Sequence, residues 1–175
     1  MEINQKNELY FVISLCLFIV TFLIISPYVH EMFHIFVAEL CGCKYYILNF
    51  KLTLLGGLLA STKLLCYLPP EKYFFVLIAG SLSTFIIGNI LIALAIYIHK
   101  KKNVVLLQMF FVSFGFILHS LLYFFEGEEY RLLFLMCGLE RYSQLFPLIG
   151  TPLLLFYLYV MYRFVVIDAE QHISK

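Results

Sequence analysis

The chain has 175 residues, of which 63% are hydrophobic and only 13% are charged. Soluble domains are about 45–50% apolar, so this composition excludes an ordinary soluble protein and leaves room for about four membrane spans. The formal net charge of +1 gives no reason to expect nucleic acid as a partner. We therefore expect one multi-pass integral membrane domain over residues 1–175, in contact with the lipid bilayer.

The first apolar stretch runs from about Leu9 to Cys41. As a helix it would measure roughly 50 Å, against a hydrocarbon core of about 30 Å. Pro27 lies inside it, and proline kinks or breaks a helix because it lacks the backbone N–H. No polar turn separates the two halves, so we expect one bent or tilted helix. No small-residue cleavage site precedes its second half, which favours a retained span over a signal peptide.

The second half of this stretch carries the pattern His-Glu-x-x-His at residues 30–34. Residues four apart share one helix face, so His30 and His34 can bind the same metal ion. Glu31 beside them can act as the general base of a zinc hydrolase. Ionisable side chains are costly in hydrocarbon, and chance produces this pattern in on the order of one per cent of such chains. We predict zinc ligands at His30 and His34 and a catalytic Glu31, with satisfied polar residues in a helix bundle as the alternative.

The next segment, residues 42–70, differs in character from the apolar stretches. It contains strand-favouring residues such as Tyr45, Ile47 and Phe50, with polar residues between them. Gly56-Gly57 is a turn signal, so we predict a short β-hairpin directly after the first helix. Because open sheet edges cannot face lipid, this hairpin must be covered by protein or lie at the membrane interface.

Three further spans are predicted at about Tyr73–Ile98, Val104–Phe125 and Phe146–Ile167. The expected fold class is therefore all-α integral membrane protein, with about four transmembrane helices (five being the alternative) and a short β element after the first. Because successive spans reverse direction, the end of the third one returns to the side of the His-Glu motif. That end carries Glu126, Glu128 and Glu129, which are candidates for a third metal ligand.

The basic residues and the cysteines give less information. On the topology above, one side of the membrane holds Lys6, Lys100, Lys101, Lys102, Arg163 and Lys175, and the other holds Lys44, Lys51, Lys63, Lys72, Arg131 and Arg141. The counts are equal, so the positive-inside rule gives no orientation. The five cysteines are odd in number and mostly lie within or beside apolar runs, so we predict no disulfide framework.

Together these features, from about Leu9 to Arg131, resemble the site-2 protease family of intramembrane zinc metalloproteases. The resemblance rests on the motif at residues 30–34, the β-prone segment with Leu55–Gly57, the second helix with Ala79–Ser81, and a later acidic residue next to glycine. It implies a Zn²⁺ cofactor and hydrolysis of peptide bonds within or near the bilayer. The implied partner is a membrane-spanning protein or peptide substrate.

The third ligand departs from the family pattern, in which an aspartate precedes a glycine. The only aspartate here is Asp168, at the far end of the last span. The resemblance therefore assigns this ligand to Glu128, with Glu126 and Glu129 as alternatives. The family's asparagine and proline ahead of that position have no counterpart here.

Two alternatives to this reading stay open, and one further residue needs an interpretation. The absent Asp-Gly pair makes plausible an inactive relative that binds or chaperones membrane proteins. A membrane metallohydrolase acting on lipids or small molecules would need the same zinc chemistry. His119, in the third span, is interpreted as a residue that supports the metal ligands or as a hydrogen-bonded core residue, rather than as a ligand.

Overall fold

The computed structural model describes residues 2–53, 57–98, 104–126, 128–139, 142 and 146–173; side chains are described for 8–51, 60–97, 105–122, 131–139, 142 and 147–163. The described chain is mostly helical, with one two-stranded sheet, which confirms the expected class. Three of its helical segments are long and apolar enough to cross a membrane: Glu8–Leu40, Pro70–Tyr97 and Val105–Leu122.

The first helix is continuous through Pro27, as α1 (Glu2–Val20), a π-helical turn η1 (Thr21–Ile25) and α2 (Ser26–Leu40). Pro27 removes one backbone donor, and the chain adapts with a wider turn in place of a break. In that turn the Ser26 N–H donates to the carbonyl oxygen of Thr21, five residues back. The expected single helix is therefore confirmed, and the effect of the proline is a change of helix type.

α2 ends at Leu40, and Gly42, just beyond the C-cap Cys41, has a φ of 97° that suits glycine better than any other residue. The N–H of Gly42 donates to Glu39 O at 3.0 Å, and the N–H of Cys43 donates to Ala38 O at 2.9 Å. This pair of bonds is the Schellman pattern, which satisfies the last carbonyls of a helix. It turns the chain directly into the hairpin beside α2.

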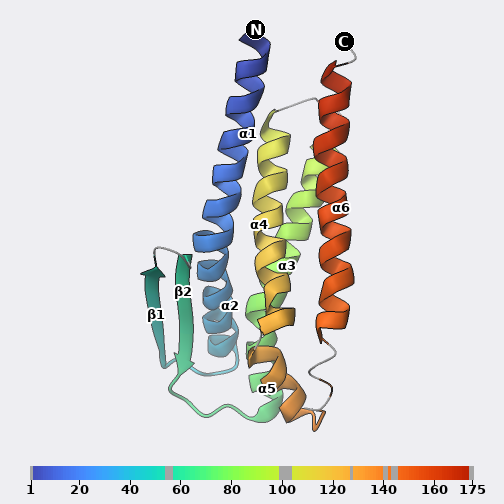
Figure 1. Cartoon of the computed structure of the whole chain (residues 1–175). Helices are drawn as coiled ribbons and strands as arrows, with labels where there is room; N and C mark the ends of the chain where they lie inside the picture. Colours follow the sequence, from blue (N-terminus) through green and yellow to red (C-terminus); the bar gives the residue numbers. More distant parts are fainter. Residues whose placement is uncertain are drawn as a thin grey trace.

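The predicted hairpin is confirmed as β1 (Tyr46–Thr53) and β2 (Gly57–Leu64), paired antiparallel. β2 lies next to α2 and β1 lies outside it (Figure 1), so the helix covers one edge of the sheet. Cys43 and Cys66, at the base of the hairpin, form a disulfide. The prediction of no disulfide was wrong, because these cysteines meet only once the hairpin has brought its two ends together.

The remaining helices are α3 (Pro70–Ile98), α4 (Val104–Glu126), α5 (Glu128–Met136) and α6 (Phe146–Ile173). α3 and α4 run in opposite directions, and the chain termini lie together at the end of the bundle far from α5 and the hairpin (Figure 1). α6 occupies the place of the expected fourth span. α5 was not predicted, since its nine residues are too few for a clear helical period.

A polar pair lies in the core between α3, α4 and α6. The Tyr157 hydroxyl donates to Asn89 Oδ1 at 2.7 Å, and Asn89 Nδ2 donates to Phe85 O at 2.8 Å. Tyr157 belongs to the largely aromatic and aliphatic cluster around Phe114 and Ile117. The amide therefore links α3 to α6 inside apolar surroundings.

Replacing Tyr157 by phenylalanine is expected to lower the free energy of unfolding by about 1 kcal/mol, because Asn89 Oδ1 would lose its partner. The measurement is unfolding in a denaturing detergent titration. Tyr159→Phe is the control, since Tyr159 is exposed on the same helix and should change nothing. Equal stability of both variants would show that the Asn89–Tyr157 bond contributes nothing measurable.

Candidate metal centre

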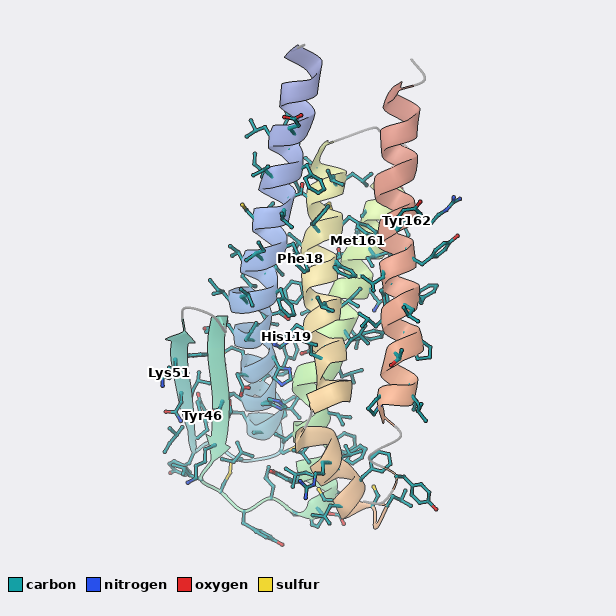
Figure 2. All side chains as sticks on the ribbon, viewed as in Figure 1. Phe18, Tyr46, Lys51, His119, Met161 and Tyr162 are labelled. Atoms are coloured by element: carbon teal, nitrogen blue, oxygen red, sulfur yellow. A yellow bond between two sulfur atoms is a disulfide. The ribbon has the colours of Figure 1, made fainter. Side chains whose placement is uncertain are left out.

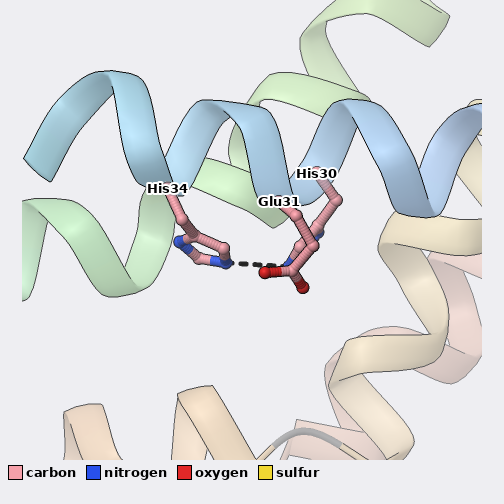
Figure 3. Close-up of side chains that lie close together, drawn as sticks. All are labelled: His30, Glu31 and His34. Carbon is pink, nitrogen blue, oxygen red and sulfur yellow. Dashed lines mark hydrogen bonds between the residues drawn. The ribbon is translucent and has the colours of Figure 1, made fainter. Parts of the chain in front are cut away.

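His30, Glu31 and His34 converge on one face of α2, pointing into the bundle (Figure 3). Their exposed fractions are 0%, 6% and 7%, so the group is buried. One ligand atom from each residue lies within 4.8 Å of the others, an arrangement that could hold a metal ion. The two Nε2 atoms are 2.9 Å apart, close to the roughly 3.3 Å expected for two nitrogens bound at ~2.0–2.1 Å to one tetrahedral zinc.

His34 is oriented by the backbone of α3. Its Nδ1 lies 2.5 Å from the carbonyl oxygen of Val76. A carbonyl only accepts, so Nδ1 carries the proton and donates it, which leaves the lone pair of Nε2 directed at the site. Metal-binding histidines are commonly fixed in this way through their other ring nitrogen.

Gly80 of α3 forms the wall against which the two imidazoles lie. A Cβ added at this position would lie 2.5 Å from His30 Cδ2, His30 Nε2 and His34 Nε2. Every residue other than glycine would therefore collide with both rings. The close approach of α3 and the buried donor set together fit a metal ion between the histidines.

Two further polar residues lie near this group, one on the same helix and one on α4. His119 of α4 is 8% exposed, and its ring centroid is 5.5 Å from that of His30 and 6.4 Å from that of Phe22. Figure 2 labels it in the interior of the bundle. Ser26 is fully buried on α2, and its hydroxyl has no hydrogen-bond partner in the described part of the chain. Ser26 was missed at the sequence level, although it precedes His30 by four residues.

The proposed third ligand, Glu128, is the first residue of α5, and its side chain lies outside the described residues, as do those of Glu126 and Glu129. The backbone confirms the expected return: α4 ends and α5 begins at the same end of the bundle as the C-terminal half of α2 (Figure 1). The side chain of Asp168 is also outside the described set, near the end of α6 at the opposite end of the bundle. The identity of the third ligand stays a prediction.

No similar protein supports the assignment of this site. No model of a known protein family, no curated protein and no solved structure matches this chain. The resemblance to site-2 proteases therefore depends on the motifs of the chain and their order. What the structure adds is a buried group of His30, Glu31 and His34 that could hold a metal ion.

Proposed function

We propose that this chain is an intramembrane zinc metalloendopeptidase that resembles the site-2 protease family. The observation that carries the proposal is the buried His30–Glu31–His34 group on a helix long and apolar enough to cross a membrane. Two imidazoles combined with carboxylates are a common donor set of catalytic zinc sites. A buried group of this kind, surrounded by apolar helices, suits peptide bonds that lie within or near the bilayer.

The residues have separate roles in this proposal. His30 and His34 would hold Zn²⁺, with Glu128 as third ligand and Glu126 or Glu129 as alternatives. Bound zinc supplies Lewis-acid activation of water and of the scissile carbonyl. Glu31 would accept a proton from the attacking water and deliver it to the leaving amine, which is general acid–base catalysis by one carboxyl group.

The fixed geometry of the histidines supports a catalytic rather than an incidental role. The Val76 carbonyl fixes the tautomer of His34, and Gly80 permits both rings to lie against α3. Preorganised groups of this kind lower the cost of reaching the transition state, because little has to move during the reaction. Burial among apolar helices also limits access of bulk water to the site.

The metal content of the purified protein tests the proposal directly. We expect about one zinc ion per chain by mass spectrometry, and loss of that zinc in both His34→Ala and Glu128→Ala. His172→Ala is the control, because His172 lies near the end of α6 at the far end of the bundle. Zinc lost only with His34→Ala would move the third ligand to another acidic residue, such as Glu126 or Glu129, or to His119. A parent protein that takes up no zinc would contradict the proposal.

A further inference from the structure

The buried hydroxyl of Ser26 lies one helical turn before His30 and has no protein partner among the described residues. A buried hydroxyl without a hydrogen bond costs about 1–3 kcal/mol. Alanine at position 26 would fill nearly the same volume, one oxygen atom less, and would carry no unsatisfied hydroxyl. A partner that the described residues do not supply, such as a bound substrate, would account for a serine at this position.

His119 of α4 contacts the two aromatic residues that flank Ser26 along the first helix. On the first helix, Phe22 precedes Ser26 by four residues and His30 follows it by four, so these two side chains flank it on the same side. The ring of His119 contacts both flanking rings, at centroid distances of 6.4 Å and 5.5 Å. The imidazole of His119 therefore lies against the two residues that flank Ser26 on the first helix, which places it near His30 on the side toward Ser26.

The position of His119 is fixed by its neighbour. The Ser120 hydroxyl donates to the carbonyl oxygen of Ser81 at 2.8 Å, which ties α4 to α3 one residue from His119 and one residue from Gly80. His119 is not a member of the three-residue group whose ligand atoms lie within 4.8 Å of one another. It therefore stands next to the metal position rather than within the ligand set.

We propose that Ser26 and His119 bind the carbonyl oxygen of the peptide bond that is to be cleaved. This oxygen gains negative charge when water attacks the carbonyl carbon, and a hydroxyl and an imidazole N–H are suitable donors to it. The inference rests on the proposed peptidase function and adds a substrate-binding role for two residues that are not metal ligands. It also accounts for a polar Ser26 inside an apolar bundle.

The test compares variants in detergent-solubilised full-length protein with a membrane-spanning peptide as substrate. Ser26→Ala is expected to lower kcat by about 100-fold, with zinc content unchanged and the thermal midpoint equal or higher. His119→Phe should show a similar loss, and His119→Gln, which keeps an N–H donor, should recover part of it. Ser113→Ala is the control, since that buried hydroxyl donates to Met109 O on its own helix.

A second readout does not need turnover. A phosphinic peptide has tetrahedral oxygens that imitate the attacked carbonyl. Its affinity for Ser26→Ala and for His119→Phe should fall by about the same factor as kcat/KM does in each variant. Wild-type kinetics and wild-type phosphinic peptide affinity in both variants would overturn the proposal, and so would a loss of zinc that parallels the loss of activity. Cleavage that persists in Glu31→Gln would instead contradict the peptidase function itself.

The disulfide supports a second, independent inference, which concerns the orientation of the bundle in the membrane. Cys43 and Cys66 lie at the end of the bundle that holds the hairpin and α5, and disulfides persist in oxidising compartments but are rare in the cytosol. The basic residues give equal counts on the two sides and so do not oppose this. We infer that this end faces the non-cytosolic side of the membrane and that both termini face the cytosol.

Cysteine accessibility in intact cells tests the orientation. In a Cys16→Ser, Cys41→Ser background, the exposed Cys137 should react with a membrane-impermeant maleimide added outside, and Cys43 and Cys66 should react only after reduction. Labelling of Cys137 only in inverted vesicles would reverse the orientation. Reaction of Cys43 and Cys66 without reductant would remove the basis of the inference.

Discussion

Replacement of Glu31 by glutamine is expected to lower kcat for cleavage of a membrane-spanning peptide by about 1,000-fold. Glutamine has nearly the same size and can occupy the same buried position, but it cannot take a proton from water. Zinc should stay bound, because the expected ligands His30, His34 and Glu128 are unchanged. The measurement is single-turnover cleavage in detergent or liposomes, together with the zinc content of the same sample.

The matched control is Glu39→Gln, because Glu39 lies on the same helix with an exposed side chain. It should cleave like the parent. Equal cleavage by Glu31→Gln and the parent would favour the inactive relative that binds membrane proteins, with a contaminating protease as the source of activity. Hydrolysis of a lipid-like ester that is lost in Glu31→Gln, without turnover of peptides, would favour the lipid or small-molecule hydrolase.

Replacement of Gly80 by alanine is expected to weaken zinc binding by about 10- to 100-fold, the usual range for residues that support metal ligands. The new methyl group would lie 2.5 Å from ring atoms of both His30 and His34. Either the rings rotate or α3 moves away, and a shift of α3 also disturbs the bond from His34 to Val76 O. Zinc affinity is measured by competition with a chromophoric chelator.

Gly88→Ala provides a closely matched control for this experiment. Gly88 lies on the same helix, and a Cβ there would also meet a side-chain atom at 2.5 Å, in this case Ile117 Cγ1. Both variants should lose stability through overpacking, by about 1–3 kcal/mol. Only Gly80→Ala should lose zinc affinity. An equal loss of zinc affinity in both variants, or no loss in either, would show that Gly80 has no specific role in supporting the metal site.

The elements that follow from local sequence pattern were predicted well. The long apolar runs identify the helices because the length needed to cross a membrane is fixed by the bilayer. The hairpin follows from strand-favouring residues around a glycine pair. His30 and His34 share a helix face because of their spacing alone, so their convergence needed no knowledge of the rest of the fold.

The parts that were missed depend on contacts between segments distant in sequence. The Cys43–Cys66 disulfide requires the hairpin to close first. The bond from His34 to Val76 and the close approach of Gly80 require the register of α3 against α2, which no local period specifies. Ser26 carries no signal of its own in sequence, since serines are common in membrane helices and its lack of a partner appears only in three dimensions.

The π-helical turn has a consequence for the angular phase of the first helix. Ser14 and His30 are 16 residues apart, which in an uninterrupted α-helix at about 100° per residue would place them roughly 160° apart, on opposite faces. One extra residue in the turn reduces this to roughly 60°, and both residues are in fact fully buried. Removing one residue from Thr21–Ile25 would therefore leave a regular α-helix with this phase nearly unchanged. Converting the turn to α-helix with all of its residues kept would instead rotate the N-terminal half by about 100° and direct Ser14 away from the bundle.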